Sequence, residues 1–322
     1  MLKRLMLSLL MLTGVAVLPA TAQEWPAKTV RIVVPFGAGS TPDTVARLIA
    51  DGLAKKYPAS AFVVENKSGA SGNIGTDAVA KAHPDGATIG ISIGGPLAIN
   101  TLLFSKLPYD PHKDIAAVTQ LITQPSALTV NPALKVDSVA ALVAALKANP
   151  GKYNFASIGN GSLSHLAMEA IAIKSGTKLV HIPYTSSPQA MTAVIRNDAQ
   201  MACLPAISVM PHAKSGKVKI LAVSTAKRSP YMPDVPTLKE SGIDVDADAW
   251  MGLIAPGGMP KAMIDKINKD VVAIIRQPDV GQKLAALLME PVGSTPEEFR
   301  ARIDGEIARW APIIKAAHVK VN

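Results

Sequence analysis

The chain has 322 residues, of which 48% are apolar, 18% charged and 4% aromatic. This composition is too apolar for a disordered protein, and the length predicts about two globular domains. The formal charge is +9, but the basic residues are scattered singly and do not alternate with aromatic residues, which argues against nucleic acid or another polyanion as the partner. A single cysteine, Cys203, excludes an internal disulfide framework, a cysteine-rich zinc site and an iron–sulfur cluster.

The first 22 residues have the pattern of a secretion signal. Lys3 and Arg4 precede an apolar run over 5–18, and Ala20-Thr21-Ala22 has the small-x-small pattern of a cleavage site. We expect cleavage after Ala22 and an exported chain; the alternative is an uncleaved N-terminal anchor. No later stretch has the roughly 18 uninterrupted apolar residues that a membrane-spanning helix needs.

From residue 29 onward, short β-branched runs alternate with amphipathic stretches of helical length. This alternation predicts an α/β fold with parallel sheets covered by helices on both faces. It is compatible with two lobes or with one large sheet. The predicted strands are 30–34, 62–65, 88–93, 128–130, 154–156, 179–183 and 218–224, and the predicted helices are 44–56, 139–148 and 165–174.

The last third of the chain changes to three successive amphipathic helices, predicted over 263–276, 280–289 and 296–317. The last helix has a clear start, because Thr295 can be the N-cap, Pro296 fits the first turn and Glu298 completes a capping box. We expect these helices to cover a sheet.

A glycine-containing loop at 35–43 joins a predicted strand to a helix, with Thr41 as the expected N-cap and Pro42 at the first helical position. A helix N-terminus offers unpaired N–H groups and a partial positive charge, so this loop could hold a small carboxylate. A tight turn without a ligand is the alternative. We expect Asp43, in the first turn of this helix, to interact with the helix dipole rather than with a ligand. The loop is not a nucleotide-binding motif, because Pro42 occupies the third glycine position and no phosphate-binding Gly-Lys-Ser/Thr occurs.

Three further segments have similar composition. The loop 157–165 follows a predicted strand and opens a helix, and we expect it to repeat the chemistry of the first loop. The segment 184–188 adds hydroxyl groups after another strand, and 69–75 predicts a turn that opens a helix. Together these loops could hold one anion between them if they belong to facing lobes.

Ser162, Ser164 and His165 raise the possibility of an exported serine hydrolase. Their spacing does not create a nucleophile with an oriented base, and the nucleophile-elbow pattern Gly-x-Ser-x-Gly is absent. No clustered histidine or carboxylate pattern indicates a metal, and Cys203 lies in an apolar run as expected for a buried residue. We therefore expect no enzyme activity, no cofactor and no metal, with the Ser162/His165 hydrolase as the alternative.

A series of short motifs then identifies a family. The sequence resembles the Bug family, the substrate-binding receptors of tripartite tricarboxylate transporters, from residue 26 to the C-terminus. The motifs are Val30-Arg31-Ile32-Val33-Val34-Pro35-Phe36-Gly37-Ala38-Gly39, Glu65-Asn66-Lys67-Ser68-Gly69, His83-Pro84-Asp85-Gly86, Leu107-Pro108-Tyr109-Asp110, His181-Ile182-Pro183-Tyr184, Pro233-Asp234-Val235-Pro236-Thr237 and Trp250-Met251-Gly252-Leu253.

The resemblance implies a periplasmic, monomeric, two-lobe receptor of the type II binding-protein fold, with a ligand cleft between lobes and a helical C-terminal cover. It would bind a small carboxylate, either a di- or tricarboxylate or an aromatic acid, and deliver it to membrane permease subunits. The implied lobes are 24–123 with 226–322, and 124–225. The implied ligand-binding residues are Phe36, Gly37, Ala38, Gly39, Ser40, Gly69, Ala70, Ser71, Gly72, Ser157, Gly159, Gly161, Ser162, His165, Tyr184 and Thr185.

The sequence departs from the family pattern at several of these positions. Ser40 stands where a second glycine is common, Thr185-Ser186 where Lys-Gly is common, and Leu204 near an expected Asp. These departures argue against recognition of a charged amino group and favour an apolar or aromatic acid. A ligand sensor that acts on a membrane signalling protein is a further alternative.

Overall fold

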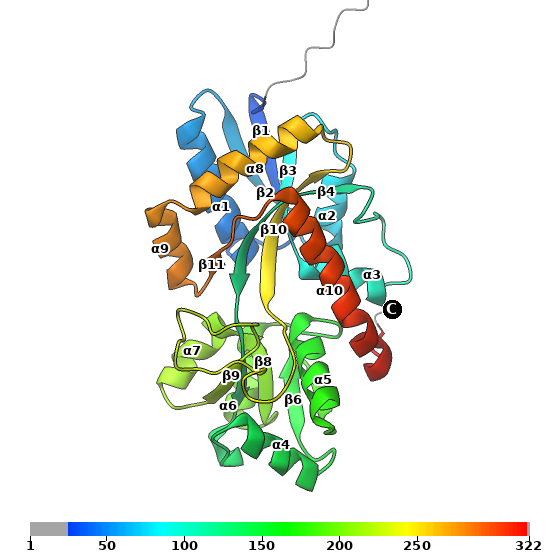
Figure 1. The fold of residues 1–322 in the computed structure, drawn as a ribbon, viewed down its shortest axis with the longest axis vertical. Coiled ribbons are helices and arrows are strands. Elements are labelled where there is room, and N and C mark those ends of the chain that lie inside the picture. The colour runs from blue at the N-terminus through cyan, green and yellow to red at the C-terminus, as the bar shows by residue number, and fades with distance from the viewer. Residues whose placement is uncertain (1–24, 321–322) are drawn as a thin grey trace, which may run out of the picture.

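The computed structural model describes residues 25–320 and contains two β-sheets, one above the other in Figure 1. The six-stranded sheet has the order β11-β4-β10-β3-β1-β2, and the five-stranded sheet has the order β7-β6-β8-β5-β9. We call each sheet with its covering helices the first lobe and the second lobe, respectively. The cleavage site predicted after Ala22 lies outside the described residues.

The strands of the first lobe are β1 Thr29–Val34, β2 Ala61–Asn66, β3 Thr88–Ile93, β4 Ile115–Gln124, β10 Ala249–Pro256 and β11 Glu290–Pro291. Its helices are α1 Thr41–Lys56, η1 Ala70–Gly72, α2 Asn73–Ala80, η2 Gly95–Ile99, α3 Asn100–Leu103, α8 Lys261–Ile275, α9 Pro278–Ala286 and α10 Pro296–Ala317.

The strands of the second lobe are β5 Ser126–Val130, β6 Asn154–Ser157, β7 Val180–Pro183, β8 Met201–Pro205 and β9 Lys219–Val223. Its helices are η3 Pro132–Leu134, α4 Val139–Ala148, α5 Leu163–Ser175, α6 Ser187–Arg196 and α7 Ala206–Lys214.

The sheets are mixed, which corrects the expectation of purely parallel sheets. In the first lobe β10 runs antiparallel to both β3 and β4, and in the second lobe β5 runs antiparallel to β8 and β9. The reason is that the chain crosses between the lobes and returns. It leaves the first lobe along β4 and comes back along β10, so one strand of each crossing opposes the local direction.

The same topology fixes where the strands end. β1, β3 and β4 run in one direction, and only Pro125 separates β4 from β5 of the second lobe. The carboxyl ends of β1 and β3 therefore point toward the second lobe. β6 and β7 oppose β5, so their carboxyl ends point back toward the first lobe. In open α/β sheets, ligands bind beyond the carboxyl ends of strands.

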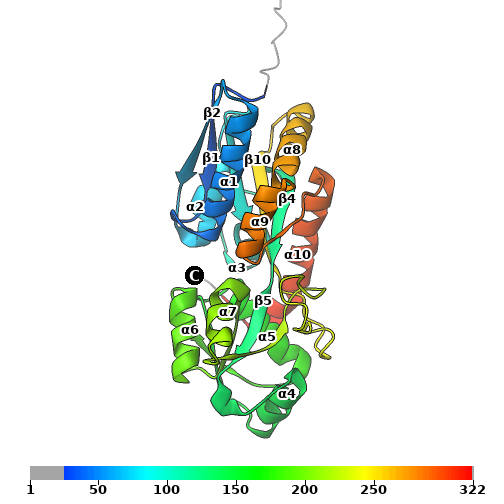
Figure 2. The same ribbon diagram turned by 90° about the vertical axis from the view of Figure 1, so that its left-hand side faces the viewer.

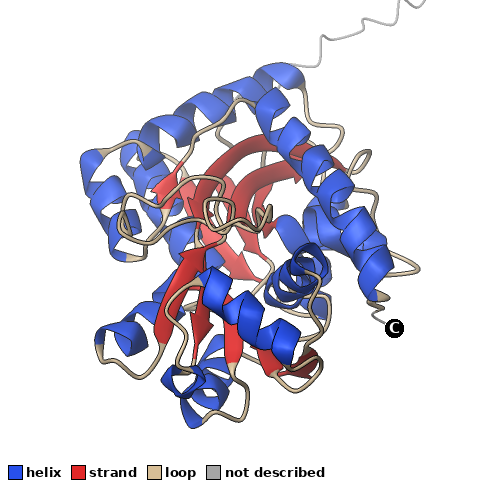
Figure 3. Ribbon diagram, turned by 60° about the horizontal axis from the view of Figure 1, so that its bottom comes forward, coloured by secondary structure: helices blue, strands red, loops and turns tan. Residues whose placement is uncertain are grey.

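Alternate residues of the central strands enter different cores. In the first lobe, Ile32 packs in a core with α1 and α8, whereas Val33 packs in a second core with α2 and α10. In the second lobe, Phe155 faces α4 and α5, whereas Ala156 faces α6 and α7. This is the two-residue period of a strand that is buried on both faces. Figure 3 shows helices on both faces of the strands in both lobes.

The C-terminal helix α10 spans both lobes (Figure 2). Phe299 and Ile303 near its start pack in the core of the first lobe, whereas Trp310 and Ile314 pack with residues of the second lobe. The predicted capping box is confirmed, because Thr295 Oγ1 accepts from the N–H of Glu298 and Glu298 Oε2 accepts from the N–H of Thr295.

The connection between β9 and β10 also packs on the second lobe. Leu238, Ile243 and Val245 are buried in the same core as Phe155. Where this connection meets β5, the N–H of Ser126 donates to Ser224 Oγ at 3.3 Å, and the hydroxyl of Ser224 donates to the carbonyl of Ala247. The crossings between the lobes are therefore tied together by buried polar contacts.

Candidate functional site

The loop between β1 and α1 is the first predicted binding segment. Ser40, with extended backbone angles, is the N-cap of α1, so the expectation that Thr41 is the cap was wrong. Pro42 still lies in the first turn, but helical geometry starts one residue earlier than the motif suggested. The shift arises because Ser40 can take the extended conformation that a residue before the helix requires.

Several donors of this loop have no acceptor. Among the described residues, the N–H groups of Gly37, Ala38 and Thr41 donate to no protein oxygen. The Oγ atom of Ser40 is buried and also has no partner within residues 25–320. Unpaired donors at the start of a helix, at the end of a strand that faces the other lobe, can bind an anion.

Asp43 holds this loop in place. Its carboxylate is 2% exposed and accepts from the N–H of Gly39 at 2.9 Å, from Arg47 at 2.9 and 3.0 Å and from Asn66 at 3.0 Å. The hydrogen bond from Arg47 lowers the pKa of Asp43 to about 2, against the effect of burial. Asp43 therefore supports the loop, and the N–H of Gly39 is used internally.

The segment 69–72 and the end of β3 complete the first-lobe side. A Cβ atom at Gly72 would lie 2.8 Å from Pro96 and 3.1 Å from the ring of Phe36, so these three residues lie against one another. Ala70 and Ser71 both have positive φ, which is uncommon outside glycine. The segment 94–96 was not predicted as part of the site, although its glycine pair after a β-branched strand resembles the other loops.

The loop 158–162 of the second lobe has a different character. The N–H of Ile158 donates to Ser164 Oγ, that of Gly159 to Ser157 Oγ, and that of Gly161 to His165 Nδ1. The N–H of Ser162 donates to the carbonyl of Gly159. Small polar side chains close to the backbone therefore accept most N–H groups of this loop, whereas among the described residues those of Asn160 and Leu163 have no acceptor.

Two histidines lie beneath this loop. The rings of His165 and His181 are stacked with centroids 3.8 Å apart, and His181 also stacks on Phe155 at 4.8 Å. His181 Nε2 lies 2.6 Å from Ser157 Oγ. Burial, together with the neighbouring His165, lowers the pKa of His181 to about 4. His181 was not predicted as a site residue, because only the parallel pairing of β6 with β7 places it opposite Phe155.

The geometry does not assemble the hydrolase considered above. His165 Nδ1 accepts from the N–H of Gly161, and its Nε2 atom lies 3.6 Å from Glu169. The hydroxyl of Ser162 donates to the carbonyl of Gly159 and caps α5 through the N–H of His165. Neither imidazole nitrogen of His165 is therefore bonded to the hydroxyl of Ser162, as a general base would require.

Tyr184 and Thr185 follow β7 at the same end of the sheet. The N–H of Tyr184 donates to the carbonyl of Ser157 at 2.9 Å, and a Cβ atom at Gly159 would lie 3.9 Å from the carbonyl of Tyr184. Burial raises the pKa of the Tyr184 phenol. Thr185 is exposed and its hydroxyl donates to Gln189. The predicted second-lobe residues thus form one cluster at the carboxyl ends of β6 and β7.

Two surface cavities lie away from these clusters. One, lined by Thr29, Arg31, His83 and their neighbours, is at the amino end of the first sheet, and the other lies between α5, the residues 244–246 and α10. Within the described part of the chain, no group of three or more His, Cys, Asp or Glu side chains could hold a metal ion. No helix there is long and apolar enough to cross a membrane.

Comparison with known proteins identifies the family. Residues 45–319 match the model of the tripartite tricarboxylate transporter family receptor. Protein BugT of Bordetella pertussis is 34% identical over 308 residues, which cover 94% of each chain. The structure of R. palustris Rpa4515 with adipate has a TM-score of 0.80 and 32% identity, and covers 92% of this chain and 99% of that one. MatC from Rhodopseudomonas palustris with bound malate has a TM-score of 0.75 and 30% identity, with coverage of 90% and 100%.

The relative and the two structures each cover at least 90% of this chain. The resemblance to the Bug family and the two-lobe α/β fold of periplasmic binding proteins are therefore confirmed. The chain belongs to the tripartite tricarboxylate transporter receptor family, a family of solute-binding receptors.

Proposed function

We propose that this protein captures a small carboxylate between its lobes in the periplasm and delivers it to membrane permease subunits of a tripartite tricarboxylate transporter. It does so without chemistry of its own and as a monomer. The relatives with adipate and with malate support a carboxylate as the ligand. Leu204 stands near the position where the family pattern has an Asp that could pair with a charged amino group, and this departure favours an acid with an apolar or aromatic body.

The observation that carries this proposal is the set of unpaired donors at the start of α1. The N–H groups of Gly37, Ala38 and Thr41 and the hydroxyl of Ser40 lie beyond the carboxyl end of β1, which points toward the second lobe. Each hydrogen bond to a charged group contributes about 1.5–3 kcal/mol. Three such bonds contribute about 4.5–9 kcal/mol together, so micromolar affinity, which corresponds to about −8.2 kcal/mol after the entropic cost of association, also requires contacts from the second lobe.

The second-lobe cluster supplies the opposing surface. We propose that Ser157, Tyr184 and the first turn of α5 contact the ligand from that side, so that the ligand binds the closed arrangement better than the open one. A ligand with this preference shifts the population toward closure. The lobes would be 24–123 with 226–322, and 124–225, with the connection before β10 moving with the second lobe because its apolar residues are buried there.

A first experiment identifies the ligand class. Thermal unfolding is followed with adipate, malate, an aromatic carboxylic acid and an amino acid at equal concentrations, with the corresponding neutral amides as controls. We expect one or more of the carboxylic acids to raise the melting temperature and the amides to have no effect. Stabilisation by the amino acid alone would overturn the preference for an apolar or aromatic acid, and no stabilisation by any acid would overturn carboxylate binding.

A second experiment tests the loop donors directly. Thr41→Pro removes one N–H from a first-turn position, and proline fits there because Ser40 already has φ −69° and ψ 161°. The matched control, Thr41→Ala, retains the N–H. We expect affinity for the best acid to fall about tenfold in Thr41→Pro relative to Thr41→Ala, measured by calorimetry. Equal affinities would show that this N–H does not contact the ligand.

A further inference from the structure

The part of the chain that forms the five-stranded sheet and its helices carries an excess of positive charge. Residues 125–224 contain nine basic and three acidic residues, a net charge of +6. The remaining described residues, 25–124 and 225–320, contain 22 basic and 20 acidic residues, a net charge of +2. The smaller part of the chain therefore carries most of the excess positive charge.

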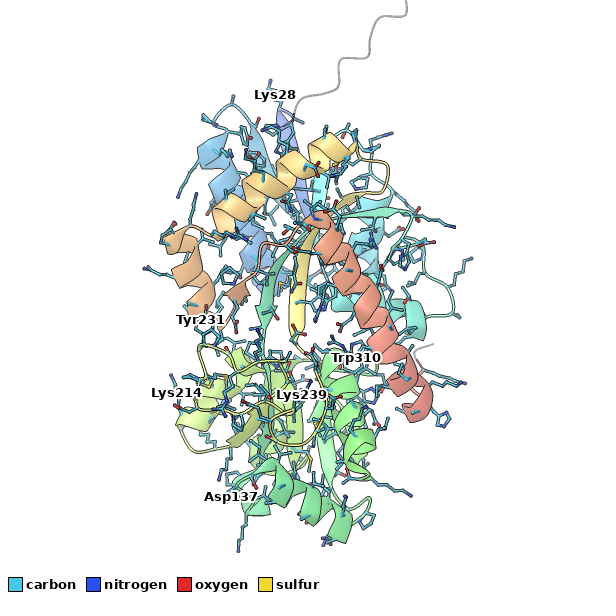
Figure 4. All side chains as sticks on the ribbon, viewed as in Figure 1. Lys28, Asp137, Lys214, Tyr231, Lys239 and Trp310 are labelled. Carbon is cyan, nitrogen blue, oxygen red and sulfur yellow. The ribbon has the colours of Figure 1, made fainter. Side chains whose placement is uncertain are left out.

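The basic residues of the second lobe gather on the half that faces away from the first lobe. β6, β7, β8 and β9 all begin on that half. Every basic residue lies in the last turn of a helix, in a connection that leads to one of these strand starts or leaves β5, or at the first position of β9. In Figure 4, Asp137 lies near the tip of the second lobe, and Lys214 lies on its flank, nearer to the first lobe. We call the nine residues the basic end: Lys135, Lys147, Lys152, Lys174, Lys178, Arg196, Lys214, Lys217 and Lys219.

All nine side chains are available for a partner. Each residue is exposed, and none forms an ion pair with any described residue. Asp137 and Asp198 are the acidic residues in the same connections, and Asp244 and Asp246 line a surface cavity together with Lys174. In the first lobe, by contrast, Lys56 pairs with Asp270 and Lys81 with Asp77.

Helix dipoles explain only part of this arrangement. Lys147, Lys174, Arg196 and Lys214 lie in last helical turns, where a positive charge is favourable in any protein. The other five residues lie in loops or at a strand start and have no such role. Two apolar side chains are also exposed beside them, Ile173 at 40% and Val180 at 45%.

The residue types indicate the kind of partner. Eight of the nine are lysine, whereas protein interfaces are enriched in arginine and depleted of lysine. Tyr153 is the one aromatic residue within two positions of any of them, which does not suit nucleic acid. Dispersed lysines with a few apolar side chains suit a surface of many mobile phosphates, where each lysine contributes separately.

We propose that the basic end is a docking surface for an anionic phospholipid bilayer. The receptor would rest on the membrane through the tip of its second lobe, which leaves the first-lobe loop and the facing loops of the second lobe away from the lipid. This proposal concerns a different surface from the ligand-binding residues and does not depend on the ligand.

Flotation with lipid vesicles tests the proposal on the chain without residues 1–22. The fraction of protein bound is compared between phosphatidylcholine vesicles and vesicles that also contain phosphatidylglycerol. We expect binding to the anionic vesicles only, with loss of binding at high salt because the attraction is screened. Binding to neither type would overturn the proposal. Equal binding to both types would also overturn it, because it would indicate apolar insertion rather than attraction to phosphate.

Charge-matched variants locate the surface. Lys152→Glu, Lys178→Glu and Lys217→Glu combined should reduce binding to anionic vesicles by at least about tenfold. The control combines Lys28→Glu, Lys106→Glu and Lys269→Glu, three exposed first-lobe lysines without ion pairs to described residues, and has the same net charge. It should keep most of the binding. An equal loss in both variants would show that only net charge matters, and melting temperatures would confirm that both fold.

Discussion

The two glycine-containing loops at the facing ends of the lobes look alike in sequence and differ in chemistry. The loop before α1 is held from outside by Asp43, Arg47 and Asn66, and leaves its N–H groups at 37, 38 and 41 unpaired. The loop before α5 is held from inside by its own serines and by His165, which accept most of its N–H groups. Glycine spacing alone therefore indicates a strand-to-helix turn, whereas the nearby side chains decide whether its donors remain available for a ligand.

The largest expected effect follows from removing the carboxylate of Asp43, which holds the loop before α1. Asp43→Ala leaves the N–H of Gly39 without its acceptor and removes one of the two acceptors of the Asn66 amide. It should destabilise the protein by about 2–4 kcal/mol. Urea unfolding measures this, with Asp51→Ala as control, because Asp51 is exposed on the same helix and its loss changes the net charge equally. A difference below about 0.5 kcal/mol between the two variants would contradict the role given to Asp43.

The next largest effect is a loss of stability at acidic pH, which we expect from His181 beneath the second-lobe loop. The pKa of His181 is about 4 in the folded protein and about 6.5 in the unfolded chain, so the unfolded chain takes up a proton first as the pH falls. The contribution of His181 to the free energy of unfolding is therefore fully present above pH 6.5. It decreases as the pH falls from 6.5 to 4, by about 1–3 kcal/mol in total.

His181→Gln keeps a hydrogen-bonding group near Ser157 and cannot titrate. Unfolding free energies measured from pH 7.5 to 4 should therefore fall less steeply in His181→Gln than in the parent protein. Parallel pH dependences in the two proteins would show that His181 does not titrate differently in the folded state.

The smallest effect compares the two helix caps. Ser162 Oγ accepts from the N–H of His165, so Ser162→Ala should cost about 1 kcal/mol. Ser40 Oγ has no partner among the described residues, so Ser40→Ala should change stability by less than about 0.5 kcal/mol but weaken binding of the carboxylate. A larger stability loss in Ser40→Ala than in Ser162→Ala would reverse the distinction between the loops.

Local patterns in the sequence predicted most elements well. The strand Thr88–Ile93 and the helices Val139–Ala148 and Pro296–Ala317 have the predicted bounds, because a regular hydrophobic period and clear capping residues define them. The long strands β4 and β10 were not predicted. Both are buried on two faces and have no alternating polar residues to distinguish them from other apolar runs.

The candidate site also contains residues that local patterns predicted and residues that depend on tertiary contacts. The turns near Gly37, Gly72 and Gly159 follow from glycine and strand patterns, since a short strand-to-helix connection needs them. The contribution of His181 and Pro96 depends on strands that are distant in sequence and become neighbours only through parallel pairing. The basic end was missed for the same reason, because its lysines are single in the sequence and become neighbours only where four strands begin.

The sequence by itself therefore determined the alternation of strands and helices, the family and the turns at strand ends, because these depend on patterns and motifs of residues a few positions apart. The tertiary structure decided which N–H groups stay unpaired, which histidines stack and where charge accumulates. Those properties arise from contacts across strands and between lobes, which a linear pattern does not contain.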